Sequence, residues 1–338
     1  MRPNTLMQSL KALIASGKNV MIEGAPGLGK TAIVKQAVTE LGEKYKVIFK
    51  HGPTMQPEDL ALPFRNDVGR LDFGRAGWIP LEGDYADDEF PVVVIDEAPQ
   101  GSNDIQKTLA NLMQERECYG IPLHKNVAFI LTGNRAKDRA GANRILSHLR
   151  NRMVTITLEP HLDDWCKWAL NHNVRPEIIG FVRFKPGALN DFDPNRDINP
   201  TPRSWAEGVN DICAMVEAGT LPPEAEIECY NGYVGEGAAS EFVSFVRMYR
   251  SLPDPDVVLK NPTTHPVPSE ASVRYALSGA LAARANEKNF ADVVAFARRM
   301  PAEFTVHCIL DSIQRCRAVQ NTKAFTDWII AEGANVLI

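Results

Sequence analysis

Residues 21–34, MIEGAPGLGKTAIV, give the clearest indication of the fold. Inside this stretch, residues 24–31 match the phosphate-binding loop pattern, G-x-x-x-x-G-K followed by Ser or Thr. The loop residues are Gly24, Ala25, Pro26, Gly27, Leu28, Gly29, Lys30 and Thr31, with Ala32 directly after them. A short apolar segment over 19–23 predicts a strand before the loop, and 31–41 has the pattern of a helix. This strand–loop–helix order is the context that a phosphate-binding loop requires.

The residue types in the loop suit a nucleotide. Glycines let backbone N–H groups turn toward phosphate oxygens, and the start of the following helix adds a positive partial charge. We expect Lys30 to contact the β- and γ-phosphates and Thr31 to hold Mg²⁺ through its hydroxyl. A chance glycine turn is the alternative, and the predicted strand and helix count against it.

A second motif, FPVVVIDEAP at residues 90–99, combines an apolar run with two acids. The unbroken run Val92–Ile95 is typical of a strand that is buried on both faces of a parallel sheet. A carboxylate at the end of such a strand is costly unless water or a cation contacts it. We therefore predict that Asp96 supports Mg²⁺ binding and that Glu97 orients and polarises the attacking water. The alternative is an acidic strand end that caps the next helix.

Further apolar runs complete an alternating pattern of strands and helices. The predicted strands cover 19–23, 46–50, 92–95, 127–132 and 154–158, and the predicted helices cover 4–16, 31–41, 105–115 and 146–150. Alternation of this kind predicts an α/β domain with a parallel sheet. Residues 57–90 are predicted to be loop-rich, 118–125 a hairpin with its turn at Gly120-Ile121-Pro122, and 252–268 a linker. After Pro160 the segments are helical.

Polar residues follow the strand predicted over 127–132. The amide of Asn134 could reach between the γ-phosphate and the attacking water, although an asparagine in a tight turn is the alternative. The string that begins at Asn134 lacks the spacing of the guanine-reading N-K-x-D motif, so ATP is favoured over GTP. The basic residues of the next stretch are Arg135, Lys137, Arg139 and Arg144. They could line a pore, bind an acidic partner, or form a solvated charged loop.

The order of glycine loop, acidic strand, polar strand end and arginines resembles the AAA+ superfamily. Within it the chain is similar to the MoxR branch, including the NorQ and CbbQ type. Residues 96–116 resemble the Walker-B helix of that branch, 118–125 its hairpin before sensor 1, and 59–80 the insertion that interrupts its second helix. The resemblance covers residues 1–210 well and the remainder loosely.

The resemblance implies roles for further polar residues. Asn134 would be sensor 1, and Arg203 would be sensor 2, touching phosphate from a helical lid. Arg152 occupies the position of the family's arginine, and Arg150 is an additional candidate. One of the two would reach the γ-phosphate bound by a neighbouring subunit, as an arginine finger. Asn151 departs from the acid that the family usually has before that arginine. The alternatives are arginines that pack beside the fifth strand or form surface ion pairs.

The resemblance also implies an architecture and an activity. The expected fold class is α/β: a P-loop AAA+ parallel-sheet nucleotide domain over 1–159, an α-helical lid over 160–255 and a C-terminal helical extension over 256–338. The protein would be an ATP hydrolase, dependent on ATP and Mg²⁺, that works as a ring homo-oligomer, a hexamer by resemblance. ATP turnover would remodel or activate a protein client, for which the resemblance suggests a protein with a von Willebrand factor A domain.

Composition limits the other classes of function. The formal net charge of −5 argues against nucleic acid as the main partner. A branch-migration or restriction-associated nucleic-acid motor stays open, because residues 149–153 also resemble RuvB-type motors and the stretch after Asn134 is basic. A scaffold that binds ATP and barely hydrolyses it is a third class, which Glu97 speaks against. Six scattered cysteines predict reduced thiols, and the lack of a long apolar run predicts a soluble, cytoplasmic protein without membrane contact.

Overall fold

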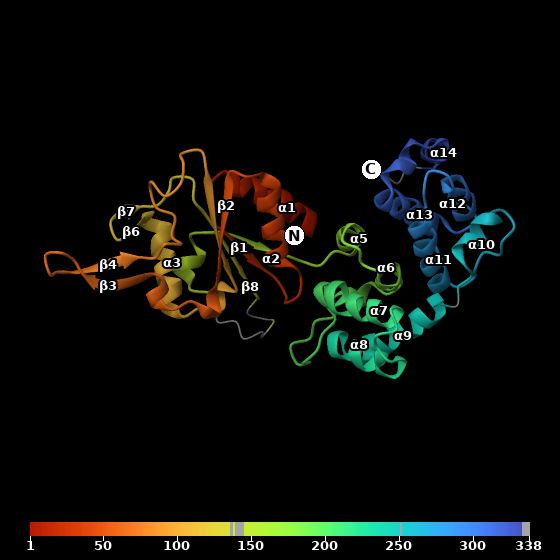
Figure 1. Cartoon of the computed structure of the whole chain (residues 1–338), viewed down its shortest axis with the longest axis horizontal. Helices are drawn as coiled ribbons and strands as arrows, with labels where there is room; N and C mark the ends of the chain where they lie inside the picture. The colour runs from red at the N-terminus through yellow and green to blue at the C-terminus, as the bar shows by residue number, and fades with distance from the viewer. Residues whose placement is uncertain (136–137, 139–144, 251, 333–338) are drawn as a thin grey trace. The chain divides into compact units, whose positions relative to one another are not determined.

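The structure, a computed structural model, describes residues 1–135, 138, 145–250 and 252–332 (Figure 1). The chain forms two compact units, Met1–His161 with Asp193–Asn195, and Leu162–Phe192 with Arg196–Ile338. The three domains expected from the sequence stay a prediction.

A parallel sheet forms the centre of the first unit, which confirms the predicted fold class. Its strands, in spatial order, are β2 (Tyr45–His51), β5 (Phe90–Asp96), β8 (Ala128–Gly133), β1 (Val20–Glu23) and β9 (Val154–Thr157). Within β5, the side chains from Val92 to Ile95 are fully buried, because helices cover both faces of the sheet.

The helices of the first unit carry the apolar faces that cover this sheet. They are α1 (Pro3–Ala15), α2 (Lys30–Leu41), α3 (Asn103–Glu115) and the short α4 (Ser147–Arg150). In Figure 1, α1 and α2 lie on one side of the sheet and α3 on the other. Ile105 and Leu109 of α3 share a buried cluster with Val93 of β5. The carboxyl ends of the parallel strands are thereby left together at one edge of the sheet.

Two small antiparallel ribbons extend from this layer; one corrects a prediction and the other confirms a predicted hairpin. The stretch 57–90 is not simply loop, because it contains β3 (Ala61–Arg65) paired with β4 (Leu71–Arg75). Most of the apolar side chains of this ribbon are exposed, so no buried face marked it in the sequence. The hairpin over 118–125 exists as β6 (Glu117–Cys118) and β7 (Ile121–Pro122).

The turn of the second ribbon lies one residue earlier than predicted. It is formed by Tyr119 and Gly120, whose φ angles are 50° and 79°. Two successive positive φ angles are typical of the two-residue turn that matches the twist of a hairpin. The prediction centred the turn on Gly120-Ile121-Pro122, because proline and glycine were the only local turn signals.

The second unit is helical. Its α-helices are α5 (Leu162–Asn171), α6 (Pro176–Phe184), α7 (Asn210–Glu217), α8 (Glu226–Val234), α9 (Glu236–Arg250), α10 (Pro255–Lys260), α11 (Ala271–Arg284), α12 (Phe290–Ala297), α13 (Ala302–Arg315) and α14 (Lys323–Ala331). The linker predicted over 252–268 is partly wrong, because it contains α10, whose Val258 and Leu259 are buried. No helix in the described part of the chain is long and apolar enough to cross a bilayer.

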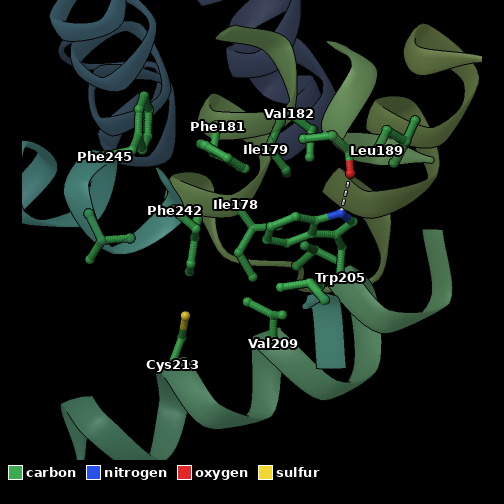
Figure 2. Packing of buried hydrophobic residues seen from close by; sticks show 14 of the residues in the cluster. Ile178, Ile179, Phe181, Val182, Leu189, Trp205, Val209, Cys213, Phe242 and Phe245 are labelled. Carbon is green, nitrogen blue, oxygen red and sulfur yellow. Dashed lines mark hydrogen bonds between the residues drawn. The ribbon is translucent and has the colours of Figure 1, made fainter. Parts of the chain in front are cut away.

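Two buried clusters stabilise the helical unit. The first surrounds Trp205, whose indole nitrogen donates to the carbonyl oxygen of Ala188 at 2.7 Å (Figure 2). The rings of Phe181 and Phe242 each have their centroid 5.3 Å from that of Trp205. The second cluster includes Trp328 of α14, which is also fully buried. The clusters explain why this half of the chain is ordered without a sheet.

Candidate nucleotide-binding site

The predicted phosphate-binding loop connects the end of β1 to the start of α2. Gly27 and Gly29 have φ angles of 74° and 80°, in the left-handed region that favours glycine. A Cβ atom at Gly29 would meet no other atom within 4 Å, so the backbone conformation and not close packing requires this glycine. At Gly24, by contrast, a Cβ atom would lie 3.0 Å from the carbonyl oxygen of Leu158. The loop is thus closely packed at its start and open at its end.

Lys30 and Asn134 meet although 104 residues separate them in the sequence. The Nζ of Lys30 donates to the carbonyl oxygens of Gly24 and Ala25 at 3.0 and 2.9 Å, and to Oδ1 of Asn134 at 2.9 Å. The lysine is 9% exposed. A nearly buried ammonium group that touches the loop and the end of β8 is a suitable cation for phosphate oxygens.

Thr31 and Asp96, the two residues predicted to hold Mg²⁺, are in direct contact. The hydroxyl of Thr31 donates to Oδ1 of Asp96 at 2.6 Å. The hydroxyl of Thr132, at the end of β8, contacts the same carboxylate oxygen. Hydroxyl and carboxylate oxygens are the ligand atoms that Mg²⁺ prefers, so this donor set fits the ion.

Glu97 follows Asp96 in a strained backbone conformation. Its φ angle is 52°, which is rare for a residue with a side chain. Its N–H donates to Oγ1 of Thr132 at 3.2 Å. On its other side, a Cβ atom at Gly52 would lie 2.8 Å from the carbonyl oxygen of Glu97. Strain that is held by neighbours on two sides is typical of functional sites.

Two residues of this site were missed by the sequence analysis. The sequence predicts Thr132 only as the last residue of a strand. The signal for its role in the site is a hydroxyl side chain at the end of an apolar run. His51 ends β2, pairs with Asp96 in the strand register and places Nε2 3.9 Å from Oε2 of Glu97. Nothing near His51 in the sequence marks it, because only the pairing of β2 with β5 brings it to the site.

The two candidate finger arginines have different surroundings. Arg150, the last residue of α4, forms an ion pair with the carboxylate of Glu23, the last residue of β1. Arg152 donates to the carbonyl oxygen of His148. Arg203 belongs to the second unit, where its Nε lies 4.0 Å from Oε2 of Glu207. The role of Arg203 as sensor 2 stays a prediction.

Part of the basic stretch after Asn134 can be located. Arg135 binds Asp138 through two hydrogen bonds of 2.8 and 3.0 Å. Lys137, Arg139 and Arg144 lie outside the described residues. The contact with Asp138 compensates the charge of Arg135 locally.

Together these side chains form one polar site at the carboxyl edge of the sheet. The glycine loop offers backbone donors, Lys30 offers a cation, and Thr31 with Asp96 offers oxygen ligands for a divalent ion. Glu97 offers a carboxylate beside them, and Asn134 an amide. This set of groups is the one that phosphoryl transfer from a nucleoside triphosphate needs.

A family model matches the part of the chain that holds this site. Residues 19–153 match the family model described as AAA domain (dynein-related subfamily). No curated protein matches the chain. Among solved structures, two variants of RuvB from Thermotoga maritima match with 13% and 15% identity, over 82% of this chain and 80% of theirs, with a TM-score of 0.41.

A further solved structure is NtrX from Brucella abortus in complex with ATP, with 13% identity and a TM-score of 0.41. The match covers 77% of this chain and 59% of NtrX. Likeness at this level carries no argument about activity, so the assignment rests on the family model and the loop. The segment that holds the phosphate-binding loop, the acidic strand and Asn134 is thus similar to the AAA domain of the dynein-related subfamily, within the AAA+ ATPases.

Proposed function

We propose that this chain hydrolyses ATP and uses the cycle, as a ring-shaped homo-oligomer, to remodel or activate a protein client. One observation carries the proposal. The ammonium of Lys30, the amide of Asn134 and the Thr31–Asp96 pair converge at the end of the glycine loop, although they come from distant parts of the sequence.

Each group has a defined task in the proposed reaction. The loop N–H groups and Lys30 bind the phosphates and offset the charge that develops on them. Mg²⁺, held by Thr31 and Asp96, supplies further charge neutralisation when it is bound. Glu97 accepts a proton from the attacking water, and Asn134 orients that water against the γ-phosphate.

The ring and the client belong to the proposal through the resemblance to MoxR-type proteins. In a closed ring of identical subunits, an arginine after β8 can complete the site of the next subunit. A hexamer and a client with a von Willebrand factor A domain are the specific forms that the resemblance suggests. Arg203, as sensor 2, would couple the nucleotide to the helical unit and so transmit the state of the site.

The exposed side chains of the two ribbons support a protein client. They are Leu62, Phe64, Leu71, Phe73 and Tyr119, with Phe73 and Tyr119 stacked at a centroid distance of 5.1 Å. An apolar, aromatic surface suits protein contacts better than contacts with a phosphate backbone. The alternative, a nucleic-acid motor, rests on the basic stretch after Asn134. Turnover that DNA stimulates, with a steep dependence on salt, would favour this alternative.

The decisive experiment measures ATP turnover per subunit as a function of protein concentration. We expect turnover to rise and then reach a plateau as rings form, while Glu97→Gln binds ATP normally and loses about 10²–10⁴-fold in rate. Lys30→Ala removes the cation that contacts the phosphates, so it serves as the control variant that does not bind ATP. Full activity in a chain shown by sizing to be monomeric would overturn the ring. Unchanged turnover in Glu97→Gln would overturn the catalytic assignment.

A further inference from the structure

We propose that Arg150 acts inside its own subunit, as the partner of Glu23 that positions the start of the phosphate-binding loop, and is not the arginine finger. This inference rests on the proposed ATPase function and separates two residues that the sequence left as equal candidates. It assigns Arg152 to the neighbouring subunit's site and Arg150 to its own.

The ion pair of Arg150 with Glu23 joins two elements that flank the loop. Glu23 is the last residue of β1, and Arg150 is the last residue of α4. The Glu23 side chain is 13% exposed and that of Arg150 44% exposed. A carboxylate so largely removed from water needs a cation, and Arg150 supplies it from the solvent side.

The backbone of Glu23 is fixed in the sheet, so the ion pair acts on a rigid base. Glu23 lies opposite Gly133 of β8 and Thr157 of β9 in the strand register. Its carbonyl oxygen accepts the N–H of Leu158 at 2.7 Å. The carboxylate is therefore held at a constant place, and Arg150 orders the side of the site from which the loop starts.

A chain of contacts leads from Glu23 to the catalytic groups. The next residue, Gly24, donates its N–H to the carbonyl oxygen of Gly133 at 3.2 Å. Its own carbonyl oxygen accepts Nζ of Lys30 at 3.0 Å, and Lys30 also contacts Asn134. Loss of the Glu23–Arg150 pair would leave a poorly solvated carboxylate one residue from this network. Its negative charge would then act directly on the Lys30 ammonium and on incoming phosphate.

Arg152 lies two residues further along the chain, and its contacts differ from those of Arg150. Its guanidinium donates to the carbonyl oxygen of His148, and no carboxylate in the described part of the chain forms an ion pair with it. A charge that is not compensated within its own subunit is available to a neighbour's phosphate. The surroundings therefore assign Arg150 to the site of its own subunit and Arg152 to the site of the neighbouring subunit.

The first test is complementation in mixed rings. Lys30→Ala chains bind no nucleotide but keep both arginines, and they are mixed with chains that carry Arg150→Ala or Arg152→Ala. We expect mixing to restore turnover to Arg152→Ala, because the neighbour supplies the missing arginine. Arg150→Ala should stay at its own low level, because no neighbour can replace a residue that acts in cis. Restored turnover in the Arg150→Ala mixture would overturn the proposal.

The second test measures ATP affinity at protein concentrations below ring assembly. Arg150→Ala is expected to weaken ATP binding about tenfold, and Glu23→Gln by less, because glutamine leaves no uncompensated carboxylate; the double variant should bind no more weakly than Arg150→Ala, because both changes break the same contact. Lys44→Ala, which removes an exposed ion pair with Asp88 in the same unit, is the matched control and should leave affinity unchanged. The exchanged pair Glu23→Arg with Arg150→Glu should recover part of the affinity.

If the losses of ATP affinity in Arg150→Ala and Glu23→Gln multiply in the double variant, the two residues act independently and the proposal is overturned. If the wild-type chain proves active without a ring, the affinity test still reports on Glu23 and Arg150. Failure of the ring and failure of this inference are therefore distinguishable.

Discussion

At the scale of single residues, the site depends on hydroxyl groups as much as on charges. Asp96 accepts hydroxyl contacts from Thr31 and Thr132, and Thr132 also accepts the N–H of the strained Glu97. Thr132 is fully buried. One hydroxyl therefore orients the predicted metal ligand Asp96 and the predicted catalytic base Glu97 at the same time.

The substitution Thr132→Val tests this arrangement, because valine keeps the shape and removes the hydroxyl. We expect a loss of about 1–3 kcal/mol in the free energy of unfolding, since the Glu97 N–H is left without an acceptor. ATP turnover should also fall in Thr132→Val. Thr132→Ser should keep most of the stability and most of the turnover. Urea denaturation and an ATPase assay measure the two effects. Equal stability of the valine variant and the wild type would contradict the role of this hydroxyl.

At the scale of elements, a buried ion pair connects α6 with α13 in the helical unit. Arg183 binds both carboxylate oxygens of Asp311, and their side chains are 13% and 5% exposed. Burial by itself lowers the pKa of Arg183, but the charge and hydrogen bonds of Asp311 outweigh it and raise that pKa above its usual value. The pair thus fixes two helices that are 128 residues apart in the sequence.

Removal of one residue of the Arg183–Asp311 ion pair should lower the free energy of unfolding. Asp311→Ala leaves the arginine charged and buried, so we expect a loss of about 3–5 kcal/mol in the free energy of unfolding. The double variant Arg183→Met with Asp311→Leu should lose clearly less, because no uncompensated charge remains. Denaturant titration of the three proteins tests this; a double variant at least as unstable as Asp311→Ala would argue against the explanation.

The same helix carries His307, whose pKa is lowered from its usual value of 6.5, first by burial and then by the charge of Arg183. The unfolded chain therefore binds a proton at a higher pH than the folded one. The contribution of His307 to stability is complete above pH 6.5 and is lost as the pH falls through the lower folded pKa.

We accordingly expect the free energy of unfolding to decrease as the pH is lowered from 7 to 5. His307→Gln should flatten that dependence, because glutamine takes up no proton in this range. Denaturation at a series of pH values is the measurement. An identical pH dependence in the variant would show that other groups are responsible.

At the scale of the whole molecule, the chain consists of two compact units with separate buried clusters. Apart from Arg203, the proposed sensor 2 that belongs to the second unit, the groups of the proposed phosphate and Mg²⁺ site lie in the first unit. Ligand binding to a folded unit stabilises that unit by an amount that grows with ligand concentration.

Calorimetry should therefore show two unfolding transitions. Mg-ADP at about 100 times its dissociation constant should raise the stability of one of them by about 2.7 kcal/mol. Lys30→Ala should abolish that shift, while Asp311→Ala should move the other transition. A single transition that both variants and the ligand move together would mean that the units unfold cooperatively.

The loop at 24–31, the acids Asp96 and Glu97 and the parallel sheet could all be predicted from the sequence. These features follow from local patterns: glycines that permit positive φ angles, and apolar runs whose period reveals burial. The resemblance that these motifs carry also indicated the AAA+ family, which the match of residues 19–153 supports.

The remaining contacts of the site depend on the tertiary structure. They join residues from different strands, helices or loops: His51 with Glu97, Thr132 with Asp96, and Arg150 with Glu23. The exposed ribbon of β3 and β4 escaped prediction because it has no buried face, and the helix α10 because proline and aspartate surround it. Local patterns predict which segments are buried, whereas the partners of a polar side chain depend on how strands far apart in the sequence are brought together.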